Sequence, residues 1–431
     1  MAVYFPPAGA RGEGGRNAEC GRQRTILRAF RRAILCAFLL GLSVPSVNAQ
    51  TASAAIPSFD APFRLGDDVL PTRYTLHFTP DFAALRFEGT ASIDVRVIHP
   101  TAVVVMHARD LDLSSARVFI QDQPVEPRIV MHPGSETVAL ELDTPLAEGD
   151  ARLELTFSGS MAALENGLYG EVVNGERYAV TDLEPNGARR VFPCFDEPAF
   201  KATFVVSATV PHELSVVSNG RLAGETVDRA TGLKVVKFNP SPVMSPYLVT
   251  LAVGDFASRA VRASNGIPVS VYGLRSQASR LDSLLKTTAA LLPRLEPYFE
   301  IPYPYGKLEV VAVPRFDGAM ENTAAILTSS ALLVDPKTAS PGELRSMATI
   351  MAHELAHQWF GNLVTMRWWD DLWLNEAFAS WMALKVTRDW RPEWQLELEG
   401  GIALRDRTLE QDAAGGLHPI SQPVTAAGVT R

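Results

Sequence analysis

Two histidines and a glutamate near residue 355 have the spacing of a metal site. The stretch AHELAHQWFGN at 352–362 contains His353 and His357, and this spacing puts both side chains on one face of a helix, one turn apart. Neutral imidazoles suit zinc, and Glu354, about 100° around the helix, lies where it can accept a proton from a water molecule. The pattern predicts a zinc ion held by two imidazoles, with Glu354 as general base. The alternative is a helix whose two histidines are core or cap residues.

A catalytic zinc ion needs a third protein ligand and one open position. Glu376 is the candidate, because it follows His357 after a glycine-ended helix and a loop, on the next predicted helix. Two antiparallel helices joined in this way can bring Glu376 back to the histidine pair. The loop also carries Asp370 and Asp371, which have two interpretations. Either of them orients a ligand imidazole, or they cap the second helix.

The elements that must position these residues are two helices with marked ends. The first is predicted over 340–362, where Ser340 and Glu343 form a capping box and Gly361 ends the helix. The second begins near Asp370 and runs through LWLNEAFASWMALKV. Apolar spacing predicts another helix upstream, and KLEVVAVP predicts a strand.

The chain before these helices reads as β structure. Tyr74, Leu76 and Phe78 alternate with polar residues, and further β-branched runs are separated by turn residues up to about residue 255. The sequence therefore predicts an α+β fold, with an antiparallel β domain followed by a mixed domain. The expected segments are a leader at 1–49, a linker at 50–66, the β domain at 67–257 and the mixed domain at 258–431.

The first 49 residues have the features of a secretory leader. A basic block ending in Arg31-Arg32 precedes the apolar run AILCAFLLGLSV, and Val47-Asn48-Ala49 fits the small-residue pattern before a cleavage point. The apolar run is too short for a convincing membrane span, and an uncleaved anchor helix is the alternative. We predict an exported protein, periplasmic or extracellular, with no stable membrane span after cleavage.

The charge of the chain argues against one class of partner, and its cysteine content argues against a disulfide. The full chain has a net charge of −8, and the leader carries seven Arg and two Glu, so the remainder has a net charge of −13. An acidic chain without basic runs argues against nucleic acid as a partner. Cys20 and Cys36 lie in the leader, so Cys194 alone remains and no intramolecular disulfide is expected.

Several motifs together resemble the aminopeptidase N family of gluzincin zinc aminopeptidases. They are HELAHQWFGN, WWDDLWLNEAFASW, GAMEN at 318–322, EPNGARRVFPCFDEPAFKATF at 184–204 and MSPYLVTLAVGDF at 244–256. The resemblance covers about residues 65 to 423, with the motifs in the family's order. Ala377 departs from the family's usual Gly. Thr323-Ala324 replaces Trp-Gly after GAMEN, which leaves the side-chain preference open.

The resemblance implies a fold and a set of roles. The fold is an N-terminal β-saddle domain followed by a thermolysin-like catalytic domain. His353, His357 and Glu376 would bind one zinc ion, and Glu354 would act as general base. The substrates would be peptides with a free N-terminus.

The resemblance also implies how the substrate is held. Glu321 would bind the free α-amino group, joined by Glu184 from the β domain, with Asp182 as a possible substitute for Glu184. Gly318 and Ala319 would touch the peptide through their backbone. Two carboxylates at the end of a cleft would select a peptide's cationic N-terminus and block a longer chain, which speaks against an endopeptidase.

One group implied by the family is missing from this sequence. The family uses a tyrosine beyond the third zinc ligand to stabilise the developing oxyanion, shortly after a stretch like that at 418–420, and no tyrosine follows Tyr305 here. We therefore expect a catalytic domain that is incomplete at its C-terminus, without the family's C-terminal helical domain, and with impaired activity. The alternative is a non-catalytic zinc- and peptide-binding remnant. Arg189 and Asp196 are expected to be structural, and Cys194 to be buried.

Overall fold

The computed structural model describes residues 64–161, 166–414, 421 and 423–424, without the side chains of 397–404 and 407. These residues belong to one compact unit, Asp60–Arg431. The predicted leader, most of the predicted linker and the stretch at 418–420 lie outside the described residues.

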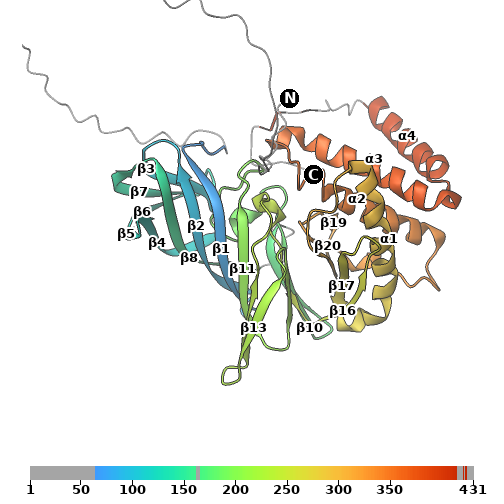
Figure 1. Cartoon of the computed structure of the whole chain (residues 1–431), viewed down its shortest axis with the longest axis horizontal. Helices are drawn as coiled ribbons and strands as arrows, with labels where there is room; N and C mark the ends of the chain where they lie inside the picture. Colours follow the sequence, from blue (N-terminus) through green and yellow to red (C-terminus); the bar gives the residue numbers. More distant parts are fainter. Residues whose placement is uncertain (1–63, 162–165, 415–420, 422, 425–431) are drawn as a thin grey trace, which may run out of the picture. The chain divides into compact units, whose positions relative to one another are not determined.

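The N-terminal part is built on an eight-stranded sheet, within the described residues (Figure 1). Tyr74, Leu76 and Phe78 alternate into its core as predicted, each at most 1% exposed. Neighbours are antiparallel except β1 and β11, which run parallel, so the predicted antiparallel domain contains one parallel pair. In sheet order the strands are β13 (Leu222–Asp228), β14 (Leu233–Phe238), β11 (Thr203–Pro211), β1 (Val69–Asp81), β2 (Arg86–Val97), β8 (Gly149–Ser160), β4 (Leu111–Ile120) and β5 (Gln123–Val125).

Two smaller antiparallel sheets complete this part. One consists of β3 (Thr101–His107), β7 (Thr137–Leu146) and β6 (Arg128–His132). The other consists of β12 (Ser215–Ser218), β15 (Leu251–Gly254), β10 (Glu176–Asp182) and β9 (Gly167–Val173). The second sheet positions Glu184, because β10 ends two residues before it.

The C-terminal part contains a five-stranded mixed sheet in which β17, β18 and β20 run parallel. Its strands, in sheet order, are β16 (Phe256–Arg262), β17 (Pro268–Leu274), β18 (Leu308–Val313), β20 (Ala325–Ser329) and β19 (Ala319–Met320). The whole of β16 pairs with β17, so the predicted division between 257 and 258 falls inside a strand of this sheet. The predicted strand at 307–314 is β18.

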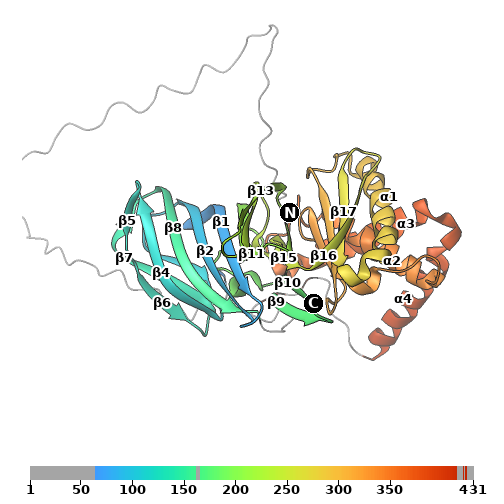
Figure 2. The same cartoon turned by 90° about the horizontal axis from the view of Figure 1, so that it is seen from below.

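Helices pack beside this sheet (Figure 2). Helix α1 (Leu281–Phe299) contacts β16 and β17, and α2 (Pro341–His357) contacts α3 (Leu372–Trp390), which is followed by α4 (Leu396–Ala413). Together with the sheets, these helices confirm the predicted α+β fold. Of the described helices, none has the length and hydrophobicity needed to cross a bilayer.

The ends of α2 only partly follow the prediction. Its start does, because the Ser340 side chain accepts from the Glu343 N–H and the Glu343 side chain accepts from the Ser340 N–H. Its end does not, because the helix stops at His357, before Gly361. Gly361 instead lies in the following turn at φ +128°, a backbone conformation that favours glycine.

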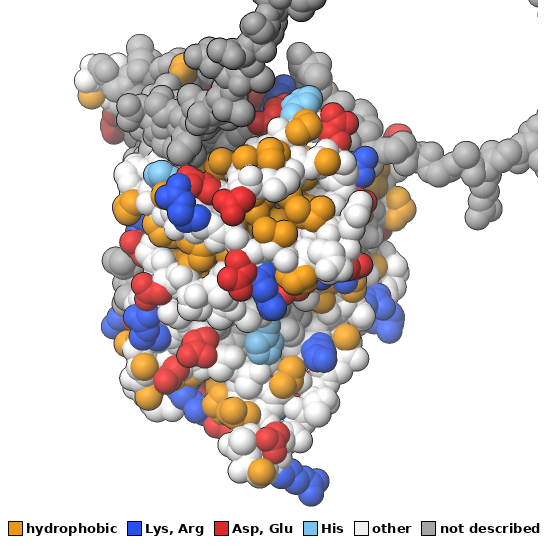
Figure 3. Space-filling model, turned by 90° about the vertical axis from the view of Figure 1, so that its left-hand side faces the viewer, with side chains coloured by type: hydrophobic (Ala, Val, Ile, Leu, Met, Phe, Trp, Pro, Cys, Tyr) orange, Lys and Arg blue, Asp and Glu red, His pale blue; other side chains and the backbone are white. Residues whose placement is uncertain are grey.

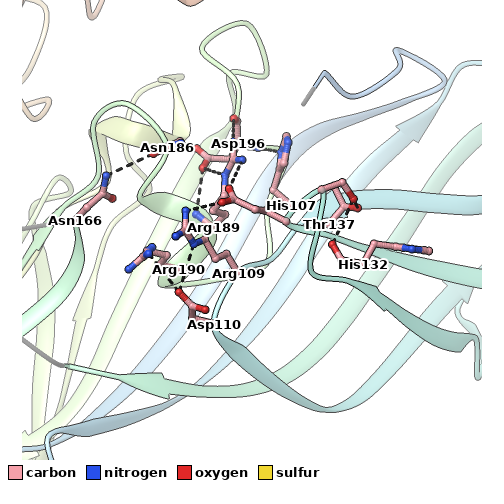
Figure 4. Close-up of polar contacts among 12 residues, drawn as sticks. His107, Arg109, Asp110, His132, Thr137, Asn166, Asn186, Arg189, Arg190 and Asp196 are labelled. Carbon is pink, nitrogen blue, oxygen red and sulfur yellow. Dashed lines mark hydrogen bonds and ion pairs between the residues drawn. The ribbon is translucent and has the colours of Figure 1, made fainter. Parts of the chain in front are cut away.

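A buried ion pair fixes the segment between β10 and β11 (Figure 4). Arg189 Nε donates to Asp196 Oδ2 at 2.8 Å, and both side chains are at most 4% exposed. Arg189 Nη1 also donates to Glu136 Oε2 at 3.0 Å, and the Asp196 N–H donates to His107 Nδ1 at 3.2 Å. The segment that carries Glu184 is thereby tied to β3 and to the turn before β7, which supports a structural role for Arg189 and Asp196.

Exposed charges form a different class of contact. Acidic and basic side chains are mixed on one face of the molecule (Figure 3). The Arg96–Asp150 ion pair, at 2.9 Å, has side chains 54% and 86% exposed. Such exposed pairs contribute little to stability, because water screens them.

We predict that Asp196→Asn lowers the free energy of unfolding by about 3–5 kcal/mol, because it leaves the buried Arg189 charge incompletely paired. Chemical denaturation measures this loss, with Asp150→Asn as the control. The control should cost less than about 1 kcal/mol. Equal losses in the two variants would contradict a special role for the buried pair.

Candidate active site

The three predicted metal ligands converge. His353 Nε2 and His357 Nε2 lie 2.8 Å apart, and the Glu376 carboxylate approaches them at 3.2 Å and 3.8 Å. One ligand atom from each residue lies within 4.8 Å of the other two. The histidines come from the last turns of α2 and the glutamate from the first turns of α3, so the antiparallel-helix arrangement inferred from the sequence brings them together.

Hydrogen bonds orient both imidazoles. His357 Nδ1 lies 3.0 Å from Asn375 Oδ1 and 3.1 Å from the Phe360 carbonyl oxygen. Both of these atoms are acceptors, so Nδ1 carries the proton and Nε2 keeps its lone pair. His353 Nδ1 lies 3.3 Å from Ser380 Oγ. Each imidazole therefore presents Nε2 to the shared point.

The residues present fit a divalent metal ion. Two imidazoles and one carboxylate form the donor set of a catalytic zinc site, which also keeps one position open. The His357 side chain is 1% exposed, whereas the Glu376 side chain is 42% exposed. The cluster is thus buried on one side and accessible on the other, as a site that admits a substrate must be.

The aspartates of the intervening loop have neither role that the sequence allowed. Asp371 occupies the N-cap position of α3, but its side chain accepts no capping hydrogen bond. The imidazole partners are Asn375, Phe360 and Ser380 instead.

Glu354 is placed by the same helix as the histidines. It follows His353 on α2 and is 4% exposed. Successive side chains on a helix project about 100° apart, so the Glu354 carboxylate lies beside the His353 imidazole, and Glu354 does not belong to the metal cluster.

Glu321 follows the edge strand β19 and is held from the end of α2. Its carbonyl oxygen accepts from Gln358 Nε2 and from Asn362 Nδ2, both at 2.8 Å. Lys201 supports Asn362 from the N-terminal part, since Lys201 Nζ donates to the Asn362 carbonyl at 3.0 Å. Burial lowers the pKa of Lys201 to about 8. These contacts fix a carboxyl residue that is itself only 3% exposed.

Gly318 and Ala319 lie at the edge of the five-stranded sheet. Ala319 belongs to β19, the last strand in the sheet order, and pairs with Thr328 of β20. The Gly318 carbonyl accepts from the Ser329 N–H at 2.9 Å. An edge strand has backbone groups available on its outer side, which is where an extended peptide can pair.

Glu184 joins Glu321 and Glu376 in a second cluster. One carboxylate oxygen from each lies within 4.8 Å of the other two, and Glu184 and Glu321 are buried. The sequence offers two acidic residues here, Asp182 at the end of β10 and Glu184 two residues after it, and this cluster contains Glu184 and not Asp182. Glu376 belongs to both clusters, so the metal cluster and the acidic cluster adjoin.

Asn375 links the two clusters, a role that no sequence pattern predicts. Besides contacting His357, its Nδ2 donates to Glu321 Oε1 at 3.3 Å and to Glu376 Oε1 at 3.2 Å. Gly361 makes room for it, because a Cβ there would lie 2.2 Å from Asn375 Oδ1. The only hint in the sequence is its position directly before Glu376.

Comparisons with known proteins find matches for both parts of the chain. The Peptidase M1 N-terminal domain matches residues 70–248, and the Peptidase family M1 domain matches residues 284–429. Aminopeptidase M1 of Arabidopsis thaliana is 38% identical over 378 residues, which are 84% of this chain and 42% of that protein. Endoplasmic reticulum aminopeptidase 1 of Homo sapiens is 34% identical over 408 residues, 90% of this chain and 43% of that protein. The chain therefore spans less than half the length of these relatives.

We predict that Asn375→Ala weakens zinc binding about 10- to 100-fold, the usual cost of removing a residue that orients a metal ligand. Competition titration with a zinc chelator measures the affinity. His357→Ala, which removes a ligand, should weaken binding further. An unchanged affinity in Asn375→Ala would show that Phe360 alone orients His357.

Proposed function

The chain belongs to peptidase family M1, and on that premise we propose that its site is that of a zinc-dependent metallo-aminopeptidase. Such an enzyme removes N-terminal residues from peptides. His353, His357 and Glu376 would hold the zinc ion. Glu321 and Glu184 would bind the α-amino group of the substrate.

The observation that carries the proposal is the sharing of Glu376 by the two clusters. In the metal cluster and in the acidic cluster, the ligand atoms lie within 4.8 Å of one another, and Glu376 belongs to both clusters. A cation bound by Glu184 and Glu321 is therefore held close to the metal. In a peptide, the N-terminal ammonium group is separated from the first peptide bond by a single carbon, so the short separation selects that bond.

The buried carboxylates supply both affinity and selectivity. An ammonium group has three N–H donors, and ionised acceptors give hydrogen bonds of about 1.5–3 kcal/mol. An acetylated N-terminus has no charge and cannot repay the desolvation of these carboxylates. The acidic end of the site thus favours cleavage at the N-terminus over cleavage within a chain.

The chemistry divides among the remaining groups. A bound zinc ion would act as a Lewis acid on the peptide carbonyl and would make water more acidic. Glu354 would accept the proton of the attacking water and deliver it to the leaving amine. Gly318 and Ala319 would align the peptide backbone along the edge of the sheet. Asn375 would hold the side chains of His357 and Glu321 in fixed positions relative to each other.

We predict that Glu321→Gln lowers the preference for a free over an acetylated N-terminus by about 10- to 150-fold, because it replaces a charged hydrogen bond. The measurement compares the affinities of the zinc-loaded chain for leucine amide and for N-acetyl-leucine amide. Asp317→Asn is a matched control, because it removes a negative charge from an exposed position just before β19, whereas Glu321 directly follows that strand. An undiminished preference in Glu321→Gln would exclude Glu321 from the amine site.

Turnover of a leucyl reporter separates an enzyme from a binding protein. Glu354→Gln should keep its zinc and lose turnover, because Glu354 is the base and not a ligand. Selective binding of the free amine with no turnover above this variant would favour the alternative, a zinc- and peptide-binding function.

A further inference from the structure

One buried tyrosine near the acidic cluster has an unusual environment. Tyr247 is 1% exposed, and among the described residues its hydroxyl has no hydrogen-bond partner. Buried tyrosine hydroxyls usually find a partner. Its position is therefore one where a donor and acceptor is kept at a cost to stability.

Tyr247 contacts the three chain segments that bear the glutamates of the acidic cluster. Next to it, Ser245 Oγ donates to the carbonyl of Pro198 at 2.6 Å, in the segment that begins with Glu184. On its other side, the Leu248 carbonyl accepts from Asn322 Nδ2 at 3.3 Å, and Asn322 directly follows Glu321. The backbone around Tyr247 is thus tied to two of the three carboxylate-bearing segments.

The ring of Tyr247 is tied to the third segment. It packs edge-to-face against Trp369, with ring centroids 5.2 Å apart. Trp369 is itself buried and begins the short 3-10 turn, Trp369–Asp371, that leads directly into α3, the helix that carries Glu376. With its backbone and ring both fixed, the tyrosine has little freedom to move its hydroxyl.

The same three carboxylates also act electrostatically on Tyr247. Burial, followed by the carboxylates of Glu321, Glu184 and Glu376, raises the pKa of Tyr247 well above its ordinary value. This electrostatic influence adds to the backbone and ring contacts described above, and the hydroxyl is bonded to none of the described residues. A ligand N–H held at the acidic cluster would supply the hydroxyl with a partner.

We propose that Tyr247 is a further substrate-binding residue, whose hydroxyl accepts one N–H of the substrate's ammonium group beside Glu184 and Glu321. This inference rests on the proposed function, because it assumes that the acidic cluster binds an N-terminus. An ammonium group offers three donors in a tetrahedral arrangement. The hydroxyl supplies a neutral acceptor where a further carboxylate would add repulsion.

The test uses Tyr247→Phe, which removes the hydroxyl and keeps the ring against Trp369. In the zinc-loaded chain, calorimetry should show that the variant binds leucine amide about tenfold more weakly or worse, as expected for a lost hydrogen bond to a charged group. Its affinity for N-acetyl-leucine amide should be unchanged. Without ligand, its midpoint of thermal unfolding should stay equal or rise, because no protein hydrogen bond is lost.

Tyr303→Phe is the matched control. Tyr303 is also buried, at 5% exposure, but its hydroxyl donates to the Lys307 carbonyl at 3.1 Å. This variant should unfold at a lower temperature and keep the preference for leucine amide. Opposite changes of stability and affinity in the two variants identify a hydroxyl kept for binding rather than for folding.

Two results would overturn the inference, and they differ. If the parent prefers leucine amide and Tyr247→Phe keeps the full preference, the hydroxyl is not part of the amine site, while the proposed function stands. If the parent shows no preference between the two amides, the acidic cluster is not an amine site, and both the proposed function and the role of Tyr247 fail.

Discussion

The site depends on holding three carboxylates together against their mutual repulsion. Glu184, Glu321 and Glu376 approach within 4.8 Å of one another. Two unit charges at this separation repel by about 3–4 kcal/mol at an effective dielectric constant of 20. No isolated loop would hold such a cluster, so the surrounding structure must fix each member separately. A bound cation, whether metal or ammonium, then relieves the repulsion.

Neutral amide side chains do much of this fixing. Asn375 donates to Glu321 and Glu376, and Asn362 holds the Glu321 carbonyl. Asn219 connects the two parts of the chain, since its Nδ2 donates to the Leu248 carbonyl at 2.8 Å and to the Thr323 carbonyl at 2.9 Å. Amides provide donors to the acidic segments without a positive charge that would compete with a bound cation. The segment that contains Glu184 is held differently. It is anchored by the buried Arg189–Asp196 ion pair, which does not belong to the acidic cluster.

The sequence alone predicts the features that depend on residues close together in the chain. The capping box of Ser340 and Glu343 follows from residues three apart, and the convergence of His353 and His357 follows from helical geometry. It failed where the decisive contact is long-range. The sequence predicts a helix end at Gly361, whereas this glycine is required for the close approach of Asn375, a residue of the next helix. Asn375 and Tyr247 lie in motifs that carry the family resemblance, but their contacts cannot be predicted from the sequence, because their partners lie on other elements. The choice between Glu184 and Asp182 also requires the fold, because the two residues lie only two positions apart at the end of β10.

The central claim is that one glutamate, Glu376, joins a metal site to an amine site. Its most direct test is a crystal structure of the zinc-loaded chain with leucine amide, with anomalous data collected at the zinc edge. The account predicts a single strong peak between His353, His357 and Glu376, and the amine nitrogen of the ligand within hydrogen-bonding distance of Glu184 and Glu321. A zinc peak among Glu184, Glu321 and Glu376, or an amine bound away from these carboxylates, would contradict it.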